Sequence, residues 1–131
     1  MIGVGAPIAA TAGVATGETT TSTSYTDLAT VGPAITLSPG RTTDQLILHA
    51  ANCRTSALGD SVAHSVAIAG AAASDADAHQ HTSSTADAVV RASVHILALS
   101  VANGSTHTMK YRVGAGTGTF TERRISAFTL N

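Results

Sequence analysis

The fold class of this chain is decided by the stretch Asn103-Gly104-Ser105-Thr106-His107-Thr108-Met109-Lys110-Tyr111-Arg112-Val113. After the Asn-Gly pair, the side chains of residues 107, 109, 111 and 113 share one side, and more polar residues alternate with them. This period of two is that of a half-buried β-strand. Asn-Gly between two alternating runs is typical of the tight turn of a β-hairpin, because both positions accept positive φ. The stretch therefore predicts a β-hairpin whose second strand follows the Asn-Gly turn.

Similar short runs occur on both sides of this stretch, separated by turn signals rich in Gly, Pro and Ser. The expected strands cover residues 25–31, 34–37, 45–51, 61–69 and 119–130. In the last of them the alternation slips at residues 122–124, which indicates a β-bulge.

Residues 86–99 fit either helical spacing or a strand. Their β-branched content and regular polar alternation favour the strand. About eight strands with frequent turns predict an all-β fold, either a β-sandwich or a jelly roll.

The first 22 residues have a different character. Glycines are scattered among Ala and Thr, without a clean period of either strand or helix. A segment of this kind does not fold alone, yet its apolar side chains favour contact with a surface. We expect an extended N-terminal arm at residues 1–22, ahead of a sandwich domain at residues 23–131, and the partner-binding candidates in the arm are Ile2, Val4, Pro7, Ile8 and Val14. A disordered leader, or a first strand of the same domain, is the alternative.

Composition narrows the choice of partners. Hydrophobic residues make up 44% of the chain but aromatic residues only 3%, so the core must be built from small side chains that each bury little area. We therefore expect self-association to supply further burial. The formal net charge is −1 and the basic residues are not clustered, which argues against a nucleic-acid partner. No apolar run reaches the length of a membrane span.

The residues able to carry chemistry do not form a recognisable catalytic set. Cys53 is the only cysteine, and a buried, unreactive thiol is the expected state. Histidines within the expected strands are interpreted as hydrogen-bonded core or interface residues, namely His49, His64, His95 and His107. The chain lacks a Gly-x-Ser-x-Gly nucleophile motif. We expect neither an enzyme nor a cofactor.

His79 and His81 are the candidates for a metal site. Residues two apart on a strand project to the same side, so these imidazoles of several copies could meet around one ion at a symmetry axis. Two ligands per chain make no site alone, and a polar surface loop without metal is the expectation for this segment.

Several stretches carry a resemblance to a known family. They are TSYTDLATVGPA at residues 23–34, AVVRAS at 88–93, MKYRV at 109–113, GTGTF at 116–120 and Arg124-Ile125. Together they resemble a family of small, jelly-roll-like virion proteins of tailed phages, described as head decoration or minor tail proteins. The resemblance covers about residues 23–130, and the His-rich segment 75–81 is not part of its pattern.

The resemblance implies a structural role in the phage particle. We expect a decoration, or cement, protein that binds the outer surface of the head and stabilises the capsid lattice. Its partners would be the major capsid protein and further copies of itself in a homo-oligomer, for which a trimer is expected. It would assemble in the host bacterial cytoplasm and lie on the capsid exterior. The alternative is a minor tail or fibre component, including one that binds the host surface.

Overall fold

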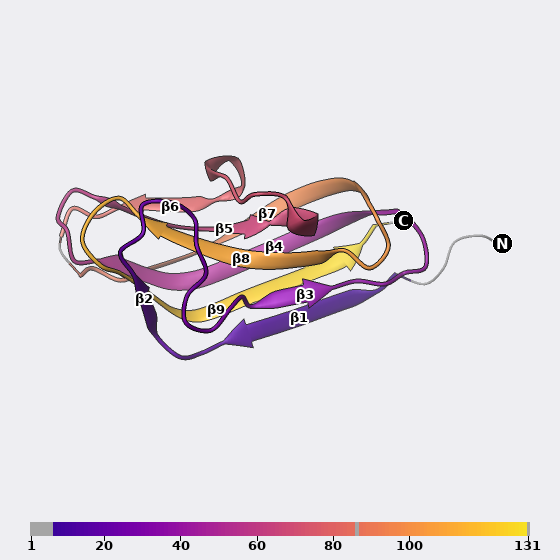
Figure 1. Cartoon of the computed structure of the whole chain (residues 1–131), viewed down its shortest axis with the longest axis horizontal. Coiled ribbons are helices and arrows are strands. Elements are labelled where there is room, and N and C mark those ends of the chain that lie inside the picture. The colour runs from indigo at the N-terminus through magenta and orange to yellow at the C-terminus, as the bar shows by residue number, and fades with distance from the viewer. Residues whose placement is uncertain (1–6, 86, 131) are drawn as a thin grey trace.

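The computed structural model describes residues 7–85 and 87–130, which form two antiparallel β-sheets packed face to face (Figure 1). In sheet A the strand order is β1 (Ala9–Val14), β9 (Gly118–Thr129), β4 (Thr43–Thr55) and β7 (Val90–Val101), and β2 (Glu18–Thr20) also pairs with β9. In sheet B it is β3 (Ala34–Thr36), β8 (Thr106–Val113), β5 (Ser61–Ala67) and β6 (His79–Thr82). The 3₁₀ turns η1 (Ile68–Gly70) and η2 (Asp75–Asp77) join β5 to β6.

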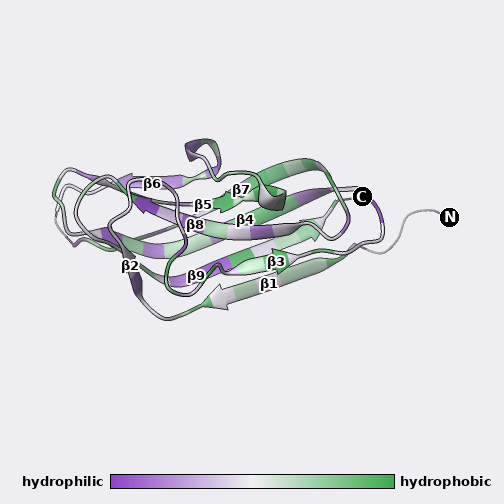
Figure 2. Cartoon of the chain, viewed as in Figure 1, coloured by the Kyte–Doolittle hydropathy of each residue, from purple (hydrophilic) through white to green (hydrophobic). Residues whose placement is uncertain are grey.

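The predicted all-β sandwich is confirmed, with nine strands among the described residues. No helix in this part of the chain is long and apolar enough to cross a membrane. Figure 2 shows that hydrophobic residues are concentrated in the half of the sandwich that holds the C-terminus, and hydrophilic residues at the opposite end.

The core lies between the two sheets because alternate residues of each central strand point inward. In β8 the four residues expected on one side, His107, Met109, Tyr111 and Val113, are all fully buried, which confirms the alternation. They meet inward residues of the other sheet and of β5, which include Ile47, Val62, Val66, Phe120 and Ile125.

The predicted hairpin at Asn103-Gly104 is wrong. The turn forms, with Gly104 at φ +77°, but β7 before it pairs with β4 in sheet A, and β8 after it pairs with β3 and β5 in sheet B. The turn is instead fastened to the loop after β3, because Gly104 donates its N–H to the Leu37 carbonyl and the Asn103 side chain accepts one from the N–H of Gly40. The sequence predicted the turn conformation, but an Asn-Gly turn does not specify whether the flanking strands pair.

The strand expected at residues 25–31 is also absent. This segment is a loop that touches β8 through one bridge, in which Thr26 and Tyr111 exchange both backbone hydrogen bonds. Beyond it Leu28 enters the core with 5% of its surface exposed. Residues 25–31 therefore contribute Leu28 to the core instead of adding a strand to the sheet.

Two other predictions in the second half of the chain are confirmed. Residues 90–101 form a strand, with alternate exposed and half-buried side chains from Val90 to Leu97. The bulge in β9 lies where the alternation slips: the register against β4 shifts between residues 121 and 124, and Glu122 has φ +48°. The extra residue turns Arg123 inward, where it is fully buried.

The N-terminal segment requires a correction. Its described part is not an arm that leaves the domain, because β1 pairs with β9 over six residues and β2 pairs with β9 beyond it. The alternative of a first strand in the same domain is the one observed. Alternate residues of β1, such as Ala10 and Ala12, pack against the core, so small apolar residues allow this edge strand to lie flat on the sandwich.

An ion pair between Glu18 and Arg123 holds the N-terminal segment against the bulge in β9. The Arg123 guanidinium pairs with the carboxylate of Glu18 on β2, and it donates to the carbonyl of Gly32 at 3.0 Å. It also lies 5.3 Å from the centre of the Tyr111 ring, whose hydroxyl donates to the same Gly32 carbonyl. These contacts join β2, β8, β9 and the loop before β3.

Candidate interaction surface

The outer face of sheet A carries an apolar row across all four main strands. The strand register places Leu97 of β7 beside Leu46 of β4, Leu46 beside Phe128 of β9, and Phe128 beside Ala9 of β1. These residues share the outward side, because directly opposed residues of antiparallel strands point to the same face. The next row of outward residues lies two residues farther along β4 and contains Leu48.

Two further leucines continue the apolar surface beyond this row, at the end of the sheet where β4 begins. Leu97 is 57% exposed, and Leu99 and Leu130, which flank the end of β4, are 66% and 50% exposed. We call the set Ala9, Leu46, Leu48, Leu97, Leu99, Phe128 and Leu130 the apolar face. Single exposed apolar side chains are ordinary, but a contiguous group on a flat sheet marks an interaction site.

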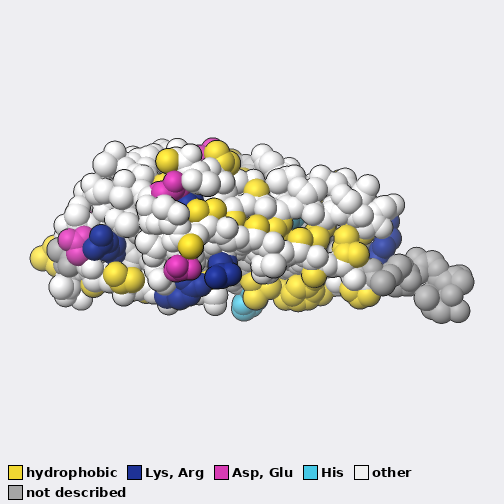
Figure 3. Space-filling model, turned by 90° about the horizontal axis from the view of Figure 1, so that it is seen from below, with side chains coloured by type: hydrophobic (Ala, Val, Ile, Leu, Met, Phe, Trp, Pro, Cys, Tyr) yellow, Lys and Arg dark blue, Asp and Glu magenta, His cyan; other side chains and the backbone are white. Residues whose placement is uncertain are grey.

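Charged side chains lie at the two ends of the apolar face. At one end the Asp44 carboxylate accepts a hydrogen bond from the Ser100 N–H at 2.9 Å. At the other, Arg124 is exposed, and Arg91 donates to the Asn52 side chain and the Glu122 carbonyl. Figure 3, which looks onto the β1 side, shows hydrophobic side chains gathered toward the right half and most charged ones farther left. The middle of the face carries no Asp, Glu, Lys or Arg side chain, and its titratable residue is His95, which stands beside Leu48.

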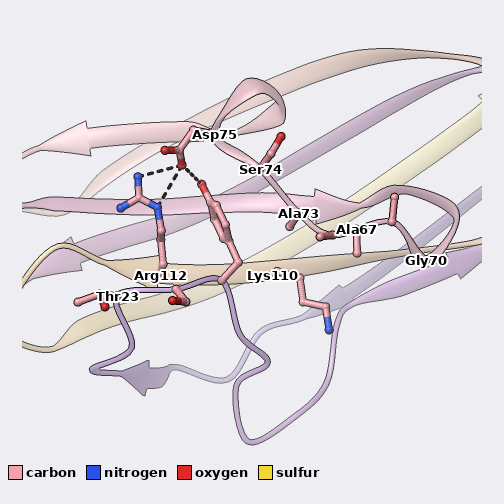
Figure 4. Close-up of a pocket in the computed structure, with 12 residues that line it drawn as sticks. Thr23, Ala67, Gly70, Ala73, Ser74, Asp75, Lys110 and Arg112 are labelled. Atoms are coloured by element: carbon pink, nitrogen blue, oxygen red, sulfur yellow. Dashed lines mark hydrogen bonds and ion pairs between the residues drawn. The ribbon is translucent and has the colours of Figure 1, made fainter.

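Sheet B carries a groove on its own outer side, of about 710 Å³, between residues 23–25, residues 70–75 and the outward side chains of β8. In Figure 4 the side chains of Asp75 and Arg112 meet at its rim. The Asp75 carboxylate accepts hydrogen bonds from the Tyr25 hydroxyl at 2.6 Å and from two nitrogens of Arg112. These hydrogen bonds hold the pKa of Asp75 below its ordinary value.

The other cation of the groove is also paired within the chain. Lys110 forms an ion pair with Asp27 at 2.6 Å. Burial and the hydrogen bond to Asp75 raise the pKa of Tyr25 to about 12, so its hydroxyl stays protonated. The charges of the groove thus serve to fasten the loop at residues 23–27 onto sheet B.

Three histidines form a chain of imidazoles between the sheets. The Nδ1 atoms of His49 (β4) and His64 (β5) are 2.8 Å apart, and the His64 and His79 (β6) rings lie 5.4 Å apart. His49 Nε2 must be the protonated nitrogen, because it lies 2.8 Å from the Asp77 carbonyl, which only accepts. His64 therefore donates through Nδ1, and both rings of this pair are neutral.

Burial keeps these rings uncharged. It lowers the pKa of His49 and of His79, and burial together with the neighbouring His49 lowers the pKa of His64 to about 2. The remaining buried histidine, His107, hydrogen-bonds Gln45 at 2.8 Å. His95, by contrast, is exposed on the outer face of sheet A.

The structure separates the residues predicted from sequence as binding candidates. Ile2 and Val4 lie outside the described residues. Pro7 is exposed, Ile8 packs against the core, and Val14 ends β1 half-buried, so these three do not form one binding surface.

His79 and His81 do project to the same side of β6, as their spacing predicted. His79 packs against His64 in the sandwich, however, and does not stand in a surface loop. Across residues 7–85 and 87–130 no group of three or more His, Cys, Asp or Glu side chains is arranged to hold a metal ion.

Cys53 is buried at the inner side of β4, and burial raises the pKa of its thiol to about 11. A thiol of this kind is protonated at neutral pH and has little nucleophilicity.

The apolar face is not predicted by the sequence alone. A signal is present in β7, where Leu97 and Leu99 point outward like Arg91 and Ser93, so that apolar residues occupy both sides of the strand. In β4 the run of apolar residues from 46 to 48 does not by itself show which of them point outward. Only the pairing of β4 with β7 and β9 shows that its outward leucines belong to a common surface.

Comparisons with known proteins show the fold. No protein-family model and no curated protein sequence matches the chain. Among solved structures, the Eiger TNF of S. frugiperda superposes with a TM-score of 0.60 at 11% identity, over 95% of this chain and 93% of that one. The infectious bursal disease virus VP2 subviral particle gives a TM-score of 0.56 at 11% identity over 94% of this chain.

The T13 particle of infectious bursal disease virus gives the same TM-score of 0.56 at 11% identity, again over 94% of this chain. The chain spans about a third of the length of these viral proteins, 33% and 31% respectively. At this identity the likeness establishes a shared jelly-roll-like sandwich, found both in viral particle proteins and in a TNF.

Proposed function

We propose that the chain is a phage capsid decoration protein, which binds the outer surface of the head and stabilises the capsid lattice. The observation that carries this proposal is the apolar face of sheet A, because contiguous exposed leucines, on a fold that also occurs in viral particles, fit a protein that works within an assembly. Such a surface fits contact between proteins, since it offers shape and apolar area but little charge.

The chemistry of the interior supports a structural role and not catalysis. The histidines of the core are held neutral and away from solvent, and the thiol is protonated. Charged side chains of the groove on sheet B pair with one another. We therefore infer a protein that acts by binding, without a cofactor.

The stabilising mechanism is physical. A protein that binds only the assembled lattice adds its binding free energy to the assembled state. Copies that are linked in a homo-oligomer, for which we expect a trimer, gain avidity, because the second and third contacts are intramolecular. The partners in this account are the major capsid protein and copies of the same chain on the capsid exterior, joined after assembly in the bacterial cytoplasm.

Copy number per particle tests the proposal. Purified virions of the phage that encodes the chain are analysed by quantitative mass spectrometry against the major capsid protein. A ratio near one copy per capsid subunit, or one per few subunits, supports decoration. A ratio that amounts to a few copies up to dozens per particle places the chain in the tail, and absence from the particle refutes a virion role.

A further inference from the structure

The outer face of sheet A is long, and it ends in an open edge. Its longest strand, β4, has 13 residues, and the edge strand β7 has 12. Within the described residues β7 pairs only with β4, so one side of its backbone is free of strand partners. A long edge strand with exposed leucines would join other strands unless something covers it.

The size of this face matches what one protein contributes to a stable interface. At about 3.3 Å per residue and about 4.8 Å between strands, the four main strands span roughly 600–800 Å². The apolar face is the part of this area around Leu46 and Leu48, and the rows with Arg91 and Arg124 lie beyond it. A standard interface buries about 800 Å² per partner. A small ligand would cover only part of such a surface.

The distribution of charge favours a partner with the same character as the face itself. Between Asp44 at one end and Arg124 at the other, the outward residues of the paired strands include no Asp, Glu, Lys or Arg. They include Leu46, Leu48 and Ser126, and His95 stands beside Leu48. A strongly charged partner would leave its own charges buried and unpaired there. A second copy presents the same apolar rows and keeps its charged ends at the hydrated rim. Two identical faces that meet form a dimer, so the expected trimer requires a further contact.

We propose that the apolar face of sheet A is the contact between copies of this chain. The inference rests on the proposed structural role, since it names one of the partners of the same surface. Self-association through this face requires no capsid protein, because the surface is formed completely by this chain. It leaves the groove side of sheet B turned away from the self-contact.

Light scattering coupled to size-exclusion chromatography tests the proposal on the purified full-length chain. The wild type is expected to elute at a multiple of its 13.0 kDa chain mass. Leu97→Glu places a carboxylate in the apolar face and is expected to weaken self-association about 100-fold or more. Leu99→Glu, at a second exposed position, should act in the same way.

Leu58→Glu is the matched control, because Leu58 is 65% exposed but lies in the loop between β4 and β5. It should leave the mass unchanged. A wild type that stays at the single-chain mass up to millimolar concentration would overturn the proposal, and so would an equal effect of Leu58→Glu.

Hydrogen exchange gives a readout that needs no variant. If copies meet on this face, the backbone amides of β7 gain protection as the wild-type concentration rises, whereas those of β6 do not. Protection of β7 that is independent of concentration would count against the proposal. Because both measurements are made without capsids, their failure is distinct from a failure to find the chain in virions.

Discussion

At the scale of single residues, the interior of this protein is unusual in being built around neutral imidazoles. His49 and His64 bridge the two sheets through one hydrogen bond, and His79 packs behind them. The sequence indicated hydrogen-bonded histidines within strands, but it could not reveal this contact, because residues 49 and 64 lie in different sheets. Only the face-to-face packing brings their Nδ1 atoms together.

This arrangement predicts that acid destabilises the fold. In the unfolded chain a histidine takes up a proton near pH 6.5, whereas folded His64 remains neutral until about pH 2. The unfolded state therefore binds more protons in this window, so the free energy of unfolding falls as the pH falls below 6.5. His64 alone contributes about 1.4 kcal/mol per pH unit there. Urea unfolding at pH 7.5, 6 and 5 measures the slope.

Two variants separate this effect from general acid sensitivity. His64→Gln should reduce the slope between pH 6.5 and 5, whatever it does to stability at pH 7.5. Val66→Ala, which removes core contacts without removing a titratable group, should leave the slope unchanged. A His64→Gln slope equal to that of the wild type would contradict the assignment.

The ion pair between Glu18 and Arg123 predicts a second residue-scale result. Burial alone would raise the pKa of Glu18, but hydrogen bonds from Thr30 and the charge of Arg123 lower it overall. Glu18→Gln leaves the fully buried guanidinium without its counter-charge, which should cost about 3–5 kcal/mol of stability. The double variant Glu18→Gln/Arg123→Met should cost less than Glu18→Gln alone, because no unpaired charge remains. The single variant Arg123→Met completes the double-mutant cycle. If the losses of unfolding free energy of the two single variants add up to the loss of the double variant, the ion pair is contradicted.

At the scale of elements, alternation in the sequence predicted the strands of the second half well. Both β8 and the bulged β9 have the boundaries and inward residues that the period of two indicated. The pairing of the strands could not be predicted from this alternation, since the turn at Asn103-Gly104 leads from one sheet to the other. Residues 25–31 alternate in sequence but meet only one partner residue on β8, so no strand forms.

The N-terminal segment shows a further limit of local patterns. Residues 9–14 have no strong strand signal, because Ala, Thr and Gly dominate them. Their strand is imposed by β9, whose free edge they satisfy, and by the anchoring of Glu18 on Arg123. Tertiary pairing overrides weak local propensity here.

Because the N-terminal segment pairs with β9, its removal should affect folding as well as binding. Removal of residues 1–20 would delete β1, β2 and the partner of Arg123, and it should prevent stable folding. Removal of residues 1–6 spares all of these, and we expect a folded protein that binds capsids weakly, because Ile2 and Val4 are lost. Circular dichroism and co-sedimentation with capsids lacking the native protein measure the two effects. Undiminished capsid binding after removal of residues 1–6 would exclude a role for these side chains.

At the scale of the whole molecule, the two outer faces have different characters. Sheet A presents leucines, and sheet B presents a groove with internally paired charges. A protein with two such faces can join copies of itself through one and leave the other for a different contact. Such a protein acts through its contacts with other chains and not through a pocket of its own.

Electron cryo-microscopy of the virion would locate the chain and reveal what covers sheet A. For a decoration protein we expect density for the sandwich at junctions between capsid subunits on the outside of the head, with sheet A of each copy turned toward another copy. Isolated copies with sheet A open to solvent, or particles that contain no density for the chain, would contradict it.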